Sequence, residues 1–239
     1  MPNIEIAFSP SVFNHFEVEN SVVVVVDILR ATSVICTMFH NGVKEIIPVK
    51  SIEEAKEYKR KGYLVVAERN GKKLDFADFG NSPFYFTPET VSGKTVVYST
   101  TNGTNAVTIG KSALDVLIGS FLNFTAIKDY LLEEDERNLL ILCAGWKGKF
   151  SLEDSLFAGA LASELIGSGK YSTICDSTQA SMDLWSLAQN DLPNYLEKVA
   201  QRHRLKKLGL DDVINYCFTK DITDVIPVLK GDRLDALKR

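Results

Sequence analysis

The sequence is poor in the residues that build zinc cages and disulfide frameworks. Its 239 residues include four cysteines, none of them in a C-x-x-C pair, and three histidines. A structural zinc site needs several Cys or His ligands at short spacing, so zinc is not the expected metal. Isolated cysteines are typical of a reducing compartment, and we expect a cytoplasmic protein with free thiols.

Long apolar runs and basic blocks are also missing. The most apolar run, Val22 to Val26, ends at Asp27 and is far shorter than the roughly 20 residues that cross a membrane. The first ten residues show no basic segment followed by an apolar one, so no signal peptide is predicted. With 27 Lys and Arg against 31 Asp and Glu, the net charge is −4. We therefore expect neither a membrane nor a nucleic-acid partner.

What the sequence does contain is a repeated alternation of β-branched runs and helical segments. Strands are expected at residues 21–27, 44–49, 63–67, 94–99, 115–118 and 138–143. Helices are expected at residues 31–40, 51–61, 103–109, 123–132, 152–166, 181–202 and 211–218, with an interruption at Pro193 and with Asn123 capping its helix. This order predicts an α/β fold in which helices flank a mainly parallel sheet.

The regular alternation ends near Tyr171, and no linker marks a domain boundary. We expect a single unit made of a sheet-and-helix core, residues 1–170, and a less regular C-terminal cap, residues 171–239. Within the cap, residues 224–229 are expected to be extended. The frequency of homodimers among soluble proteins makes a homodimer the default assembly.

Polar residues come directly after four of the expected strands, and ligands of open parallel sheets bind beyond the carboxyl ends of strands. These segments are residues 27–33, 68–71, 99–104 and 144–154. Because parallel strands bring their carboxyl ends to the same edge, the sequence predicts a site there.

Asp27 has two interpretations at the end of its valine strand. It is either a cap for the next helix or a rigidly held metal ligand or nucleophile. Dehalogenase-type phosphatases need a second Asp two positions later, and Leu29 stands there instead. Together with Glu68, Glu153 and Asp154, Asp27 would form the oxygen-rich pocket that suits Mg²⁺. Glu153 and Asp154 also have an ordinary explanation, since acidic residues stabilise the start of a helix.

The run from Ser99 to Thr104 combines hydroxyls with Asn-Gly before an expected helix. Helix N-termini attract anions, so the run suits a phosphate, and it is equally typical of a capped turn. Thr32 and Ser33 come after Arg30 in the same pattern. A tight turn at residues 80–83 offers further donors to the same anion.

Five of these motifs, in this order, resemble the 2-phosphosulfolactate phosphatase family. They are Asp27-Ile-Leu-Arg-Ala-Thr-Ser33, Glu68-Arg-Asn-Gly71, Gly80-Asn-Ser-Pro83, Thr100-Thr-Asn-Gly-Thr104, and Ala144-Gly145 followed by Phe150-Ser-Leu-Glu-Asp154. The similarity extends from Ile4 to residues 224–227. It implies a Mg²⁺-dependent phosphatase of coenzyme M biosynthesis that hydrolyses (2R)-2-phospho-3-sulfolactate to 3-sulfolactate and phosphate, on an α/β fold of its own type.

The chemistry implied by this resemblance assigns a role to each candidate residue. The metal ligands are expected to be Asp27, Glu68, Glu153 and Asp154, and the catalytic residues Asp27, Arg30, Glu153 and Asp154. The phosphate is expected to contact Arg30, Thr32, Ser33, Asn81, Ser82, Thr101, Asn102, Gly103 and Thr104. The carboxylate and sulfonate are expected to contact Arg69, Lys147, Lys149, His203 and Arg204.

Two alternatives remain open at this point. One is a Mg²⁺-dependent phosphatase for another small phosphorylated acid. The other is a non-catalytic module that binds an anionic metabolite. Such a module would keep donors for the anion but would have no need of four acids in its pocket, so the positions of the acids distinguish it from an enzyme.

Overall fold

Ten strands form one sheet in the computed structural model, which describes residues 1–133 and 137–237. The strands are β1 (Ile4–Ala7), β2 (Ser21–Val26), β3 (Glu45–Pro48), β4 (Leu64–Arg69), β5 (Lys72–Lys73), β6 (Thr95–Ser99), β7 (Asp115–Gly119), β8 (Asn138–Cys143), β9 (Pro227–Lys230) and β10 (Arg233–Ala236). The helices are α1 (Ala31–His40), α2 (Ile52–Arg60), α3 (Pro88–Val91), α4 (Gly103–Ile109), α5 (Phe124–Glu133), α6 (Leu152–Gly167), α7 (Asp176–Ala188), α8 (Leu192–Leu196), α9 (Ala200–Lys207) and α10 (Asp212–Cys217).

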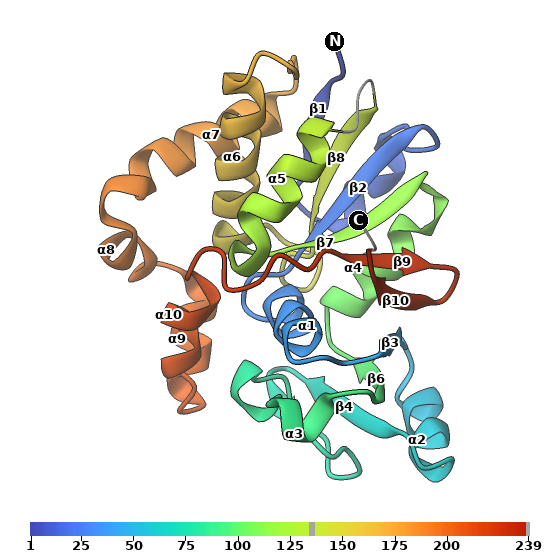
Figure 1. The fold of residues 1–239 in the computed structure, drawn as a ribbon. Coiled ribbons are helices and arrows are strands. Elements are labelled where there is room, and N and C mark those ends of the chain that lie inside the picture. Colours follow the sequence, from blue (N-terminus) through green and yellow to red (C-terminus); the bar gives the residue numbers. More distant parts are fainter. Residues whose placement is uncertain (134–136, 238–239) are drawn as a thin grey trace.

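The sheet consists of two parallel halves joined by a hairpin, and the short edge strand β5 pairs antiparallel with β4. The strand order is β1-β8-β2-β7-β9-β10-β3-β6-β4-β5. The pairs within β1-β8-β2-β7 and within β3-β6-β4 are parallel, whereas β9 and β10 pair antiparallel with each other, with β7 and with β3. Figure 1 shows the hairpin in red between the two halves. The mainly parallel α/β fold predicted from the sequence is thus confirmed.

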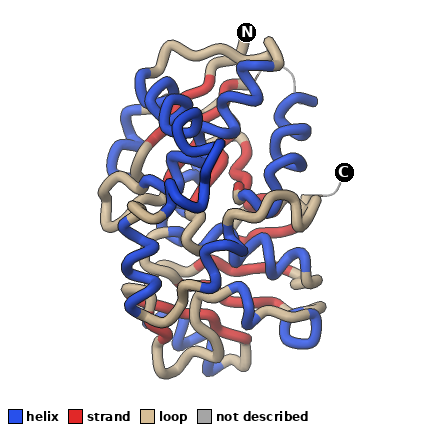
Figure 2. Tube along the Cα trace, turned by 90° about the vertical axis from the view of Figure 1, so that its left-hand side faces the viewer, coloured by secondary structure: helices blue, strands red, loops and turns tan. Residues whose placement is uncertain are grey.

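The valines of β2 show why this sheet is covered on both faces. Successive side chains of a strand point to opposite faces. Val22, Val24 and Val26 accordingly pack in one core with residues of α5 and α6, and Val23 and Val25 pack in another with residues of α1 and α4. All six residues of β2 are buried. The turned view in Figure 2 shows helices on either side of the strands.

Some element boundaries differ from those expected. The helical region expected at residues 181–202 is interrupted near Pro193, as expected, and Pro193 lies in the first turn of α8. A second break separates α8 from α9, so the region forms three helices, α7 to α9. Asn123 does not cap α5. Its side chain accepts a hydrogen bond from the Ser120 backbone amide in a capping box one short turn earlier. The sequence does not predict β1, β5 or β10, and the expected cap segment contributes β9 and β10 to the sheet.

The close packing of α6 on α7 depends on Gly159. A Cβ atom built at this position would lie 1.9 Å from the carbonyl oxygen of Ser181. We expect Gly159→Ala to force the two helices apart and to lower the free energy of unfolding by about 1–3 kcal/mol, measured by urea denaturation. Gly167→Ala on the same helix is the control, since no heavy atom lies within 4 Å of its built Cβ. Equal stability of the two variants would contradict this account.

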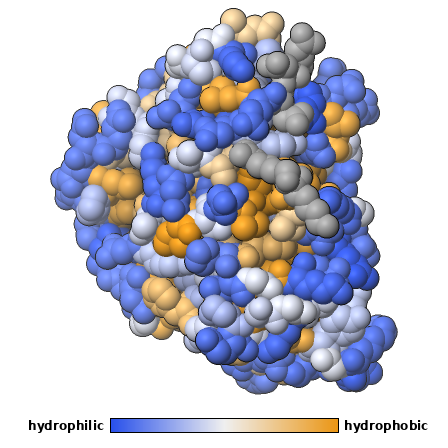
Figure 3. Space-filling model, in the orientation of Figure 1, coloured by the Kyte–Doolittle hydropathy of each residue, from blue (hydrophilic) through white to orange (hydrophobic). Residues whose placement is uncertain are grey.

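No helix among the described residues is both long and apolar enough to span a membrane. The face shown in Figure 3 is mainly hydrophilic, and its apolar residues lie in separate patches.

Candidate active site

One pocket collects residues from the carboxyl ends of β2, β4, β6 and β8 and from the start of α6. Its cavity volume is small, about 20 Å³. The lining residues are Asp27, Leu29, Arg30, Glu68, Gly71, Asn81, Asn102, Gly145, Trp146, Glu153, Asp154 and Gln201. The four polar strand ends therefore meet at one place, although β7, β9, β10 and β3 separate β2 from β6 in the sheet.

Asp27 both supports the turn after β2 and faces the pocket. Its Oδ1 accepts a hydrogen bond from the Ala31 amide at 3.3 Å, which stabilises the start of α1. Its Oδ2 lies 3.0 Å from a Cβ built at Gly103, and that Cβ would be only 2.4 Å from the Cβ of Ala31. A glycine at this position therefore lets the start of α4 approach Asp27. The capping interpretation therefore accounts for Oδ1, whereas Oδ2 accepts no hydrogen bond from the described residues and can act on a ligand.

Asp154 ties two strand ends together at the floor of the pocket. Its Oδ1 accepts from the Ile28 amide at 2.9 Å, and its Oδ2 accepts from the Gly145 amide at 3.1 Å. Ser151 caps α6, its hydroxyl accepting from the Asp154 amide at 3.5 Å. This arrangement fixes the ends of β2 and β8 relative to α6.

Glu68 ties together the segments that follow β4 and β6, as Asp154 does for β2 and β8. Its Oε1 accepts from the Thr101 amide at 2.7 Å, and its Oε2 accepts from the Gly71 amide at 2.6 Å and the Thr101 hydroxyl at 3.2 Å. Both oxygens are thus engaged within the protein. The geometry makes Glu68 an organiser of the loops that form this wall.

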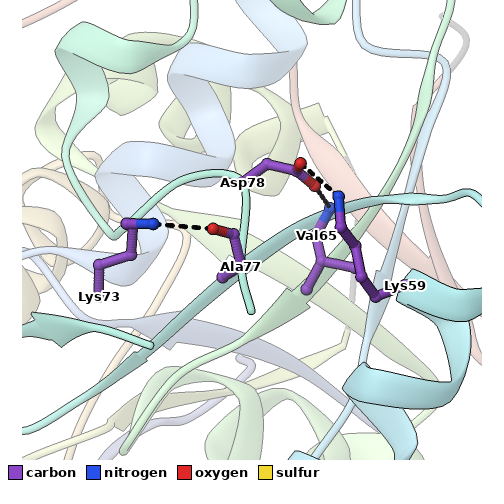
Figure 4. Close-up of polar contacts among 5 residues, drawn as sticks. All are labelled: Lys59, Val65, Lys73, Ala77 and Asp78. Carbon is purple, nitrogen blue, oxygen red and sulfur yellow. Dashed lines mark hydrogen bonds and ion pairs between the residues drawn. The ribbon is translucent and has the colours of Figure 1, made fainter. Parts of the chain in front are cut away.

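Asn81 reaches the pocket on a loop that runs along the outer edge of β4. Figure 4 shows the anchor of this loop: Asp78 accepts from the Val65 amide at 2.8 Å and forms an ion pair with Lys59, and Lys73 donates to the Ala77 carbonyl. Further along, the Tyr98 hydroxyl lies 2.5 Å from Asn81 Oδ1.

The Oδ1 of Asn81 is therefore occupied, and its amide nitrogen has no partner among the described residues. That nitrogen is a donor for a ligand in the pocket.

Arg30 is a buried cation without an anionic partner. Its residue is 4% exposed, it lines the pocket, and it forms no ion pair with any carboxylate in the described part of the chain. Burial lowers the pKa of its guanidinium, while the nearby charges of Glu68 and Asp27 act in the opposite direction. Desolvating an unpaired charge is costly, so the position is suited to a ligand that brings negative charge.

The pocket also concentrates carboxylates whose ionisation is unfavourable. Burial, and then the charges of Glu153 and Glu68, raise the pKa of Asp27 to about 7. Burial raises the pKa of Glu153, and burial with the charges of Glu153 and Asp27 raises the pKa of Asp154 well above its usual value. A cation in the pocket would stabilise the ionised carboxylates and lower their pKa values.

The donor set fits Mg²⁺ but not an all-protein metal cage. No three Asp, Glu, His or Cys side chains come together closely enough to hold an ion within residues 1–133 and 137–237. Mg²⁺ is commonly held by one or two carboxylates, with water and substrate oxygens completing its coordination. Asp27 and Glu153 can supply those carboxylates, since the oxygens of Glu68 and Asp154 already accept backbone hydrogen bonds.

The raised carboxylate pKa values predict how the stability of the metal-free protein depends on pH. Between the unfolded pKa of Asp27, 3.8, and its folded value of about 7, the folded state holds a proton that the unfolded chain has released. Stability therefore falls as pH rises through this window, by on the order of 3 kcal/mol from Asp27 alone.

Urea denaturation in EDTA between pH 4 and pH 8 measures this effect. Mg²⁺ is expected to restore stability near pH 7. A metal-free stability that increases steadily from pH 4 to pH 7 would contradict the burial argument.

Several predicted phosphate contacts lie outside the pocket, and the polar atoms of most of them are used within the protein. The Thr32 hydroxyl accepts from the Asp27 amide, and the Ser33 hydroxyl donates to the Ile28 carbonyl. Ser82 is buried at the start of a short 3₁₀ turn. The Thr104 hydroxyl and backbone amide close a turn with Thr100. These residues shape the loops rather than line the cavity.

The remaining predicted residues divide in the same way. Asn102 lines the pocket, whereas Thr101 supports Glu68, and Gly103 permits the close approach of α4. Arg69 does not line the pocket, and its guanidinium donates to the carbonyls of Lys50, Glu68 and Ser99 and to the Ser99 hydroxyl.

The predicted contacts for the acid groups are mostly peripheral. The structure places Lys147, Lys149 and His203 at exposed positions outside the lining. Arg204 is partly buried and lies against two lining residues, Trp146 and Gln201.

Comparison with known proteins gives a consistent result. The family model described as 2-phosphosulpholactate phosphatase matches residues 8–232. This chain belongs to that family. A protein of Caldanaerobacter subterraneus subsp. tengcongensis is 39% identical over 91% of each chain, and one of Clostridium novyi is 38% identical over 94% of this chain and 95% of its own. A protein of Thermotoga maritima is 39% identical over 89% of this chain and 90% of its own. All three are named probable 2-phosphosulfolactate phosphatase.

The fold and pocket described above are therefore those of a 2-phosphosulfolactate phosphatase family member, a family of phosphoric monoester hydrolases. The four acids of this family member lie in one pocket. That arrangement argues against the non-catalytic binding module, which has no need of four acids in its pocket.

Five lining residues are not among the site residues expected from the sequence. Leu29, Gly71 and Gly145 belong to the recognised motifs, whereas Trp146 and Gln201 do not. Trp146 lies in the polar segment after β8, but no sequence motif singles it out as a site residue. Gln201 belongs to α9, and the sequence places it within a longer helix. Its proximity to His203 and Arg204 was the one available signal.

Proposed function

We propose that this chain hydrolyses (2R)-2-phospho-3-sulfolactate to 3-sulfolactate and phosphate, with Mg²⁺ as cofactor. The observation that carries the proposal is Arg30, a buried guanidinium without an anionic partner in the described chain, in the same pocket as Asp27 and Glu153. A phosphate ester supplies the missing negative charge, and the acids supply the cation site. The names of the relatives support this choice of ester.

The lining residues divide the work of hydrolysis. Arg30 binds the phosphoryl oxygens and stabilises the charge that spreads over them during transfer. The Asn81 amide nitrogen and Asn102 help to orient the same group. Bound Mg²⁺, held by Asp27 and Glu153, would neutralise phosphoryl charge. The ester P–O bond breaks, an oxygen from water ends on the phosphate, and a proton goes to the hydroxyl of 3-sulfolactate.

Asp27 has two possible roles within this scheme. Its Oδ2 attacks phosphorus and forms an acyl phosphate that water then cleaves, or it holds the metal and orients an attacking water. Both roles require the free oxygen on the pocket side. Acid quench during turnover of ³²P-labelled substrate separates the two, because only the first leaves label on the protein.

Phosphate release from synthetic 2-phosphosulfolactate tests the proposal directly. We expect release with Mg²⁺ and its loss in EDTA, with recovery when Mg²⁺ is added back. Absence of release at any Mg²⁺ concentration would reject this substrate. A panel of two- and three-carbon phosphorylated acids, with and without the sulfonate, would then identify a phosphatase for another small acid.

Coenzyme M biosynthesis is the setting that we propose for this reaction, since the resemblance implies it. The cytoplasmic location and the homodimer stay predictions.

A further inference from the structure

Helix α9 supplies one wall of the pocket through Gln201. This side chain is 7% exposed, and its Nε2 donates to the Leu29 carbonyl at 3.1 Å, next to Arg30 in the chain. Its Oε1 accepts from Nη1 of Arg204 at 2.8 Å. Gln201 therefore links the β2–α1 turn to a cation one turn further along α9.

Arg204 rests on a second lining residue, Trp146. Its guanidinium carbon lies 4.5 Å from the centre of the Trp146 ring. The Trp146 segment is itself held in place. The backbones of Trp146 and Lys149 exchange hydrogen bonds of 3.0 and 3.1 Å, and the Lys147 amide donates to Asn102 Oδ1 at 3.2 Å. Stacking on an aromatic ring restrains a guanidinium without consuming its hydrogen-bond donors.

The charge of Arg204 is available to a ligand. It forms no ion pair with a carboxylate in the described part of the chain, whereas Arg202 on the same helix lies 2.6 Å from Glu197. Among residues 1–133 and 137–237, Gln201 alone accepts a hydrogen bond from one of the five N–H donors of Arg204. Its positive charge acts on the pocket, since it favours the ionised form of Glu153. Arg30 lines the pocket and Arg204 contacts two of its lining residues, Trp146 and Gln201, so the two cations belong to one site.

We infer that Arg204 is the residue that selects substrates with a second anionic group, which it binds while Arg30 binds the phosphate. The second group is the carboxylate or the sulfonate, both of which accept paired hydrogen bonds from a guanidinium. Trp146 and Gln201 are positioning residues, because their contacts hold the Arg204 guanidinium in place beside the pocket. This inference rests on the proposed function. It selects Arg204 from the five residues that the sequence offers as contacts for the carboxylate and sulfonate, which are Arg69, Lys147, Lys149, His203 and Arg204.

The test compares Arg204→Gln with Lys207→Gln, a variant that removes the same charge from an exposed position of α9. The substrates are 2-phosphosulfolactate and glycerol 2-phosphate, a secondary phosphate ester without acid groups. We expect Arg204→Gln to raise KM for 2-phosphosulfolactate about 10–100-fold, with a smaller change in kcat. The ratio of kcat/KM for 2-phosphosulfolactate to kcat/KM for glycerol 2-phosphate should be at least about tenfold lower in this variant than in the parent protein.

Lys207→Gln should keep the preference of the parent protein. An equal loss on both substrates, or a lower melting temperature with unchanged preference, would show that Arg204 merely packs α9 on Trp146 and would overturn the inference.

Binding of 3-sulfolactate provides a readout that does not depend on hydrolysis. This product carries the carboxylate and sulfonate but no phosphate, and calorimetry measures its affinity directly. We expect Arg204→Gln to weaken binding about 10–100-fold relative to the parent protein. Equal binding by both proteins, or no binding by the parent, would overturn the inference. A parent protein that binds 3-sulfolactate in this way but releases no phosphate would reject the proposed function alone.

Discussion

We expect Asp27→Asn to lower kcat/KM by at least about 10³-fold while preserving the fold. Asparagine has nearly the same shape, so its oxygen can still accept from the Ala31 amide. The pocket-facing atom, however, becomes an amide nitrogen that neither attacks phosphorus nor binds a cation. Phosphate release with saturating Mg²⁺ measures the loss, and circular dichroism checks the fold.

Asp27→Asn is expected to lower activity but to increase the stability of the metal-free protein. It removes a carboxylate whose pKa burial and neighbouring acids raise to about 7, so metal-free Asp27→Asn should unfold at a higher temperature than the parent near pH 7. Asp183→Asn, at an exposed position of α7, is the matched control and should change neither property. Retained turnover in Asp27→Asn with Mg²⁺ would reject the role assigned to Asp27.

Arg30→Gln is expected to reduce kcat/KM about 10²–10³-fold, comparable to the loss of one preorganised donor to a charged transition state. The substitution removes the only cation among the residues that line the pocket. Inhibition by inorganic phosphate should weaken in parallel, because the product uses the same contacts as the substrate. Steady-state kinetics with and without added phosphate measure both effects.

Arg60→Gln, at the exposed end of α2, controls for a general change in charge. Arg30→Lys distinguishes charge from geometry, since lysine supplies the charge without the paired donors, and we expect partial activity. Unchanged phosphate inhibition in Arg30→Gln would contradict the assignment of Arg30 to the phosphoryl group.

The sequence was sufficient to predict where the site lies because that prediction depends on backbone direction alone. A run of valines ending in Asp27 defines a buried strand, and parallel strands bring the residues after their carboxyl ends to one edge of the sheet. Glu68, Asn102 and Gly145 came together for this reason. No knowledge of side-chain conformation was needed.

The individual contacts were less predictable, since they depend on where each short side chain turns. A hydroxyl at a strand end can face a ligand or bond to the nearby backbone, and both are common for Ser and Thr. The hydroxyls of Ser33 and Thr104 bond to nearby backbone carbonyls, whereas Asn102 reaches the pocket. Trp146 and Gln201 come from segments far apart in the chain, so their contact through Arg204 depends entirely on tertiary packing.

The hairpin β9–β10 has a consequence for the order in which the molecule is assembled. It lies at residues 227–236 yet occupies the middle of the sheet, between β7 and β3. During synthesis both parallel halves leave the ribosome before the segment that joins them, and each then presents an unpaired strand edge. Such edges favour association between chains, and pairing so distant in sequence is slow. We therefore expect the last strands to limit the rate of folding, with the catalytic pocket completed only when they arrive.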